Sequence, residues 1–249
     1  MSTSKDQPEP QTAKKDTFAE MLLPLYHGPQ VTVRLGPTGP TYMLSKALLC
    51  KKSTYFLKMF EGNYAEASTS YVTLQEDATT FKPSFELFIE WLYLGKFTLP
   101  EEDRASQISC LLNLARFADM SVIDELTDLV ARSIEQIITE DPDVKKKREA
   151  PTVSKYGTSN VRHLTTRHVR MVGGLPTGNA VRRVLIIALV EPYLRAECFI
   201  PTFADRIVQY PNLAFDLLTE VRQTMLAAVP RAGKIWIKDP LTQIEVSLK

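Results

Sequence analysis

The chain has 249 residues, of which 44% are hydrophobic and 24% charged, and its net charge is +1. This composition is typical of a globular protein with one large domain or a domain plus a smaller companion. The longest apolar run, residues 184–190, is far shorter than the roughly 20 residues that a membrane span requires. Polar residues 1–17 lack the apolar core of a secretory signal, so we expect a disordered tail on an intracellular protein.

The first predicted elements after this tail are a helix and a β-hairpin. Phe18, Leu22 and Leu25 fall on one face of a helix. The side chains of Val31, Val33 and Leu35 then alternate as in a strand, residues 36–40 have the glycines and prolines of a turn, and Tyr42 and Leu44 continue the alternation. Ser45 and Ser53 each precede a short apolar segment, which predicts two helices with serine N-caps.

The next predicted elements are a strand at residues 71–74 and a series of helices. The clearest helical period in the chain covers residues 81–94, with Thr79 or Thr80 as its N-cap and Gly95 at its end. Its apolar face, which we expect to be core, holds Phe81, Phe85, Phe88, Ile89 and Leu92. Two further helices are indicated by Ile108, Leu111, Leu112 and Ala115, and by Val122, Leu126, Val130, Ile134, Ile137 and Ile138.

Three segments of this first half form a recognisable pattern at their spacing. They are Ser45-Lys46-Ala47-Leu48-Leu49 leading to Ser53-Thr54-Tyr55-Phe56, Val72-Thr73-Leu74 followed by Glu76-Asp77, and residues 85–95 with Trp91-Leu92-Tyr93 before Gly95. Together they resemble the BTB domain, also called POZ. The resemblance implies an α+β fold with helices around a small, mainly three-stranded sheet, here followed by a helical C-terminal region. This plan is most similar to fungal BTB proteins with a short helical C-terminal region.

The resemblance also implies a candidate partner site. BTB domains that recruit a cullin scaffold of a ubiquitin ligase commonly carry a hydrophobic residue, any residue, and then Glu after a helix that ends in Met-Phe. Here Met59 and Phe60 are followed by Tyr64 and Glu66, which we predict to contact cullin-3. Tyr64 would be an aromatic anchor and Glu66 a hydrogen-bond acceptor. The alternative is that Tyr64 packs on its own domain and Glu66 caps backbone amides.

Other residues bear on the partners that the family uses. Many members place a leading helix across a dimer, so Phe18, Leu22 and Leu25 predict a homodimer interface. Many also have Asp before the first strand and His before the following Lys, where this chain has Gln30 and Ser45. These changes leave Lys46 without the usual acidic companion and argue against a charged corepressor pocket.

The two halves of the chain differ in charge. Residues 1–142 hold 13 Lys and Arg against 20 Asp and Glu, a net charge of −7, whereas residues 143–249 hold 17 against 9, a net charge of +8. Lys145, Lys146, Lys147 and Arg148 form a run that resembles a nuclear import signal, and the alternative is a solvated charge cluster. The cations show no single helix face for groove entry, so nucleic-acid binding is not favoured.

These patterns divide the chain into five parts. We expect residues 1–17 to be the tail, 18–140 the BTB domain with its following helix, 141–175 a basic linker, 176–228 a helical region and 229–249 a C-terminal tail. The helical region could be a small domain or pack onto the first half. The apolar run Ile235-Trp236-Ile237 could dock within the chain or bind a partner.

The sequence favours a binding protein over an enzyme. No Ser or Cys nucleophile lies near a His in any motif, and Cys50, Cys110 and Cys198 are too far apart to suggest a disulfide framework or a metal cage, so we expect neither metal nor cofactor. The leading hypothesis is a non-enzymatic adaptor built on a BTB domain, possible partners being cullin-3 and a second copy. The alternative is a nuclear or transcription-associated scaffold, and either protein would reside in the cytoplasm, the nucleus or both.

Overall fold

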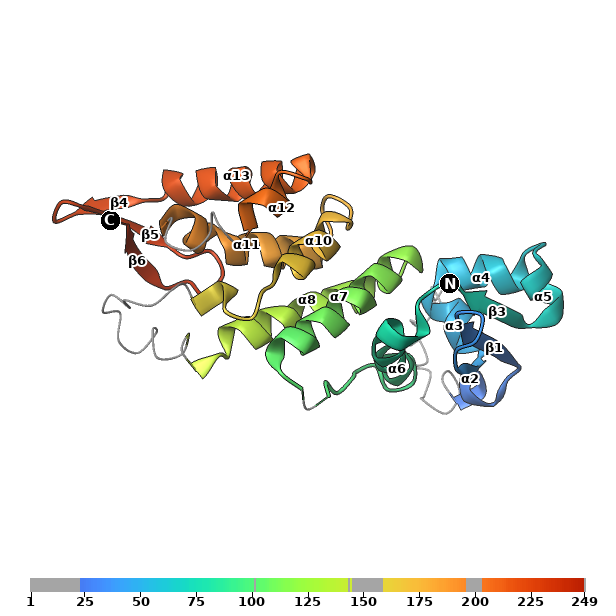
Figure 1. Cartoon of the computed structure of the whole chain (residues 1–249). Coiled ribbons are helices and arrows are strands. Elements are labelled where there is room, and N and C mark those ends of the chain that lie inside the picture. Colours follow the sequence, from blue (N-terminus) through green and yellow to red (C-terminus); the bar gives the residue numbers. More distant parts are fainter. Residues whose placement is uncertain (1–22, 101, 143, 145–158, 196–202, 249) are drawn as a thin grey trace, which may run out of the picture.

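The computed structural model describes residues 23–100, 102–142, 144, 159–195 and 203–248. Figure 1 shows an elongated molecule with a small sheet and short helices at one end, long helices in the middle and a second small sheet at the other end. The long helices therefore connect two regions that contain strands.

The first sheet has three strands in the order β2-β1-β3. β1 (Gln30–Leu35) pairs antiparallel with β2 (Thr41–Ser45) and parallel with β3 (Tyr71–Leu74), so that Val33 lies opposite both Tyr42 and Val72. The predicted alternation is confirmed, because Val31, Val33 and Leu35 are buried on one face. Gly36 begins the hairpin connection with a φ of +65°, a conformation that a side chain would strain.

Four short helices surround this sheet: α2 (Leu23–His27), α3 (Lys46–Lys52), α4 (Thr54–Glu61) and α5 (Ala65–Thr69). Both predicted serine caps are confirmed. The Ser45 hydroxyl accepts from the Leu48 amide at 3.2 Å, and the Ser53 hydroxyl accepts from the Phe56 amide at 3.1 Å. Ser53 also donates to the Ser121 carbonyl at 2.6 Å, which joins the start of α4 to the end of a long helix.

That long helix, α7 (Arg104–Met120), meets α6 (Ala78–Leu94) in an aromatic core. The ring of Phe117 lies 4.9 to 5.6 Å from the rings of Phe81, Phe85 and Phe88. Gly95 ends α6 in the left-handed conformation, as predicted. The predicted N-cap was wrong: α6 begins three residues earlier, where Asp77 accepts from the Thr79 amide at 3.1 Å.

The interval expected to be a basic linker contains structure in its described part. After α8 (Asp124–Thr139), residues 159–175 form η1 (Ser159–Val161) and α10 (Thr166–Gly173). His168, Val169 and Val172 of α10 are buried, and the two valines belong to the same hydrophobic core as the first sheet. The linker prediction therefore fails for residues 159–175, because a helix of eight residues shows too few turns for its period to stand out in the sequence.

The helical region consists of α11 (Ala180–Arg195), α12 (Asp205–Ile207) and α13 (Pro211–Leu226). α11 packs against both α8 and α13, and its buried residues belong to the same continuous core as those of α8. Of the two arrangements left open, the helices thus pack back onto the first half. Within the described part of the chain, no helix combines the length and the apolar character needed to span a membrane.

The expected C-terminal tail contains an antiparallel sheet of β4 (Val229–Arg231), β5 (Lys234–Lys238) and β6 (Glu245–Leu248). Ile237, Val246 and Leu248 form a small separate core on one face of this sheet. The apolar run at residues 235–237 therefore docks within the chain through Ile237, while Ile235 remains 44% exposed.

Candidate protein-binding surface

The turn between α4 and α5 exposes a large aromatic side chain. Tyr64 directly precedes α5, and its side chain is 62% exposed. Its carbonyl accepts from the Ala67 amide at 3.1 Å, which closes the first turn of α5. Its hydroxyl has no hydrogen bond to any residue that the structure describes. Figure 1 shows α5 at the end of the molecule that lies farthest from the C-terminal sheet.

Gly62 holds this turn in place. Its amide donates to the Lys58 carbonyl at 2.9 Å and ends α4. A Cβ atom at position 62 would lie 2.3 Å from the Lys58 oxygen and 3.4 Å from Cδ2 of Tyr64. The Lys58 oxygen therefore leaves no room for a side chain at position 62, and the ring of Tyr64 lies next to this glycine.

Glu66 lies in the first turn of α5 and is partly exposed. Burial raises the pKa of the Tyr55 hydroxyl, and the negative charge of Glu66 raises it further, which places the two side chains near each other. The Glu66 carboxylate accepts no hydrogen bond from a described backbone amide, so the alternative role as an amide cap has no support in this geometry. Its oxygens are left available to a donor from outside.

Of the two remaining residues of the predicted site, one is buried and the other is partly buried. Phe60 is 1% exposed, and its ring stacks on Phe56 with centroids 6.0 Å apart. Met59 is partly buried against the same core. Phe60 is therefore a core residue without a free surface for a partner, which corrects its predicted role as a contact. Met59 and Phe60 thus hold α4 against the hydrophobic core.

The sequence analysis missed one apolar residue on the outer side of α4. Leu57 is 43% exposed, whereas Phe56 and Phe60 are buried. The helical period could have predicted this exposure. Residues 56 and 60 lie on the buried side of the helix, and position 57 therefore lies at the edge of that side. We define the α4–α5 surface as Leu57, Tyr64 and Glu66.

A comparison with known protein families identifies the fold that carries this surface. Residues 27–134 match the family model of the BTB/POZ domain. The match runs from the end of α2 into α8 and thus covers the first sheet, the α4–α5 surface and the aromatic core. The chain contains a BTB/POZ domain. BTB domains are generally interaction modules rather than enzymes, so the protein has a protein-binding role.

Within the BTB domain, Lys46 does have an acidic companion, contrary to the expectation from Gln30 and Ser45. Its ammonium group lies 2.9 Å from the Glu61 carboxylate. The partner comes from the last turn of α4, because α3 and α4 pack against each other. Glu61 is half exposed, so the pair contributes little to stability, and it sets a charged pair directly before the Gly62 turn.

The other predicted interaction residues are only partly visible. Phe18 and Leu22 of the predicted dimer interface, and the basic run Lys145 to Arg148, lie outside the described residues. Leu25 lies in α2 and is partly buried against the core of its own domain, and its carbonyl accepts from the Ser45 hydroxyl. Part of the apolar surface of Leu25 is thus already used within the chain.

The structure also joins a serine and a histidine that the sequence keeps 59 residues apart. Nε2 of His168 on α10 lies 2.7 Å from the Ser109 hydroxyl on α7, and Nδ1 accepts from the Thr165 amide at 3.2 Å. Since Nδ1 is an acceptor, Nε2 carries the proton and donates to Ser109, which in turn donates to the Ala105 carbonyl at 3.0 Å.

The histidine therefore cannot act as a base toward Ser109 in this arrangement. Burial lowers the pKa of His168 to about 4, and the nearby positive charge of Arg167 lowers it as well. A neutral donor that is buried at 1% exposure joins two helices and does not activate a nucleophile. The pair is a structural link between the BTB domain and α10.

Proposed function

We propose that the protein is an adaptor whose BTB domain binds the cullin-3 scaffold of a ubiquitin ligase through the α4–α5 surface. The observation that carries this proposal is the exposed Tyr64, which follows the tight Gly62 turn and whose hydroxyl has no partner among the described residues. A rigid aromatic side chain with a polar tip is the residue type that most often dominates binding energy at protein interfaces.

Leu57 and Glu66, on the two helices that the Tyr64 turn joins, support the proposal. Leu57 adds exposed apolar area on α4, and Glu66 adds a charged acceptor on α5. An apolar centre beside a charged acceptor matches the usual anatomy of an interface, in which a few anchors are surrounded by polar contacts. Because Phe60 packs beneath this turn, the partner would meet a surface that is already ordered.

The test is calorimetric titration of the full chain with the N-terminal domain of cullin-3. We expect submicromolar binding that Tyr64→Ala or Glu66→Ala weakens by more than about 1 kcal/mol. The matched control is Leu94→Ala, because Leu94 is also 62% exposed but lies at the end of α6. The absence of binding at high micromolar concentration, or equal losses in Leu94→Ala and Tyr64→Ala, contradicts the proposal.

The proposed adaptor is a homodimer in which the leading helix crosses between two BTB domains. The support is the family membership of residues 27–134 together with the apolar face that includes Leu25. Light scattering at micromolar concentration should give about twice the chain mass of 28.1 kDa. A mass equal to that of one chain contradicts the dimer.

The second candidate is a nuclear BTB scaffold, favoured by the basic excess of the second half. The test of this second candidate must leave residues 159–175 intact, because α10 is part of the core. Alanine substitutions at Lys145, Lys146, Lys147 and Arg148 in the fluorescently tagged full chain should then shift it from nucleus to cytoplasm. An unchanged distribution removes the basic run as the import signal.

A further inference from the structure

Helix α13 has apolar side chains on two opposite faces. Leu213 and Leu217 are buried against the rest of the helical region at 1% and 2% exposure. The opposite side exposes Phe215 at 70%, Leu218 at 52%, Met225 at 36% and Leu226 at 72%. At 100° per residue these four side chains share one stripe along the helix. We call this stripe, together with Arg222 inside it, the outer face of α13.

The other two helices of 16 residues show why this face is unusual. α8 buries one apolar side and exposes acidic residues such as Asp124, Glu125 and Asp128. α11 is apolar on most sides and is correspondingly buried between α8 and α13. A helix that is apolar all round is normally buried. Among the described residues, however, nothing covers the outer face of α13, and Figure 1 shows this helix at the margin of the molecule.

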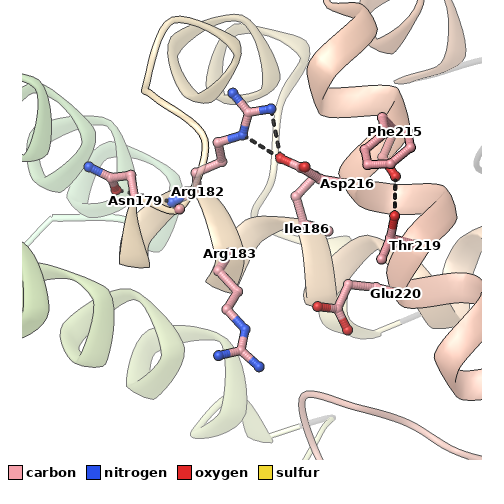
Figure 2. Close-up of a pocket in the computed structure, with 9 residues that line it drawn as sticks. Asn179, Arg182, Arg183, Ile186, Phe215, Asp216, Thr219 and Glu220 are labelled. Carbon is pink, nitrogen blue, oxygen red and sulfur yellow. Dashed lines mark hydrogen bonds and ion pairs between the residues drawn. The ribbon is translucent and has the colours of Figure 1, made fainter.

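A small pocket adjoins this face, between α11 and α13. Its volume is about 200 Å³, below the roughly 300 to 1,000 Å³ of pockets that enclose drug-sized ligands. Phe215 and Ile186 supply apolar walls (Figure 2). A pocket of this size fits a side chain of a bound protein better than a separate small molecule.

Most polar groups of the pocket are used within the chain. Nε of Arg182 donates to Asp216 at 2.7 Å, and Nη1 of Arg182 donates to the Leu175 carbonyl at 2.8 Å. The Thr219 hydroxyl donates to the Phe215 carbonyl at 2.8 Å. Arg183 on α11 and Glu220 on α13 also line the pocket (Figure 2). Neither side chain forms an ion pair or a hydrogen bond with a described residue.

The charges of this surface indicate what could cover it. Arg222 lies between Phe215 and Leu218 on one side and Met225 and Leu226 on the other, and no described carboxylate pairs with it. If a second copy covered this face with its α13 antiparallel, the two apolar stripes would lie on each other with position 222 near the centre. The two Arg222 side chains would then meet. That repulsion disfavours a self-complementary contact. A partner with a carboxylate at the centre of its apolar stripe would instead neutralise Arg222.

We propose that the outer face of α13 and the adjoining pocket bind an amphipathic helix of another protein. This helix has large apolar residues at intervals of three and four and an Asp or Glu in the middle of that stripe, opposite Arg222. Helices of this kind commonly bind apolar grooves through such spaced anchors. The inference rests on the proposed adaptor function, because it names the surface that holds the second protein.

The test begins with selection of 16-residue peptides from a random display library on the purified full chain. Enriched peptides are then synthesised and titrated by fluorescence anisotropy. We expect apolar residues at helical spacing around a central Asp or Glu, with binding at least tenfold weaker for the variants Phe215→Ser and Arg222→Glu. Replacing the central acid of the peptide by Lys should restore binding to Arg222→Glu, a rescue that general damage to the fold would not allow.

Two control variants separate the possible failures. Gln223→Ala, on the same helix beside the stripe, should bind the peptides like the natural chain. Tyr64→Ala should also bind them normally while it loses cullin-3, so each of the two proposals can fail without the other. Selection that yields no peptide sensitive to Phe215→Ser overturns the inference. A chain dimer in sedimentation that Phe215→Ser dissociates also overturns it, since a second copy would then cover this face.

Discussion

The side-chain amide of Asn160 donates a hydrogen bond of 2.8 Å to the carboxylate of Asp239, 79 residues further along the chain. Both residues are almost fully buried, at 1% and 0% exposure. The same carboxylate accepts from the Thr242 hydroxyl and from the Leu241 amide. Asp239 therefore joins η1 to the connection between β5 and β6, and so ties the C-terminal sheet to the helices.

Removal of this carboxylate should destabilise the protein. Asp239→Ala leaves three donors without their acceptor, and we expect the free energy of unfolding to fall by about 3 kcal/mol. Urea denaturation measures the loss. The control is Asp128→Ala, an exposed position on α8, which should change stability by less than about 0.5 kcal/mol. Equal effects of the two substitutions would mean that the buried bonds are not needed.

The neutral His168 should make stability depend on pH. Its pKa is about 4 in the folded chain, against 6.5 for the free side chain, because burial disfavours the charged form. The unfolded chain therefore binds the proton more readily, and the contribution is fully present above pH 6.5 and lost as pH falls toward 4. Between pH 7 and pH 5 we expect a loss of about 2 kcal/mol from this group.

The control for this prediction replaces each of two histidines with an amide that cannot titrate. His168→Gln should remove that part of the pH dependence, whereas His27→Gln, at an exposed position, should keep it because His168 is still present. The carboxylate of Asp103 and the guanidinium of Arg167 act on His168 in opposite directions and are unchanged in both variants. Identical pH profiles for His168→Gln and the natural chain would rule out this origin.

Gly62 should be sensitive to the smallest possible side chain. Gly62→Ala places a Cβ atom 2.3 Å from the Lys58 oxygen, so the backbone must shift. We expect a loss of about 2 kcal/mol in stability and weaker cullin-3 binding, since the same shift moves Tyr64. Gly28→Ala is the control, because its Cβ would meet only the Pro24 oxygen at an ordinary 3.6 Å. If both variants unfold at the same urea concentration, the close contact does not constrain the turn.

The local elements of the BTB domain could be predicted from the sequence. Val31, Val33 and Leu35 alternate as strand residues must, and Ser45, Ser53 and Gly95 have side chains or backbone freedom that define helix ends. These signals depend on neighbours in sequence, which is why they held in the structure. The cap at Asp77 was missed because the downstream threonines Thr79 and Thr80 offer the same chemistry.

Contacts between distant segments could not be predicted in this way. The Lys46 to Glu61 ion pair and the contact of Ser109 with His168 each join residues whose relation depends on how helices pack. The sheet of β4, β5 and β6 was missed for a different reason, the shortness of its strands. β4 has only three residues and β6 has four, too few for an alternation to be distinguished from chance. The exposure of Tyr64 was also undecided, since an aromatic residue suits a core and a surface anchor equally.

Helix α13 shows most clearly which features the local sequence determined and which features the tertiary packing decided. The four-residue spacing of Leu213, Leu217 and Val221 by itself indicated that a helix forms there, because helical period is a property of the local chain. With apolar side chains on both sides, that spacing holds no preference for the side that faces inward. Only the packing of α11 decided it, since burial of Leu213 and Leu217 against the core leaves Phe215 and its stripe to the solvent.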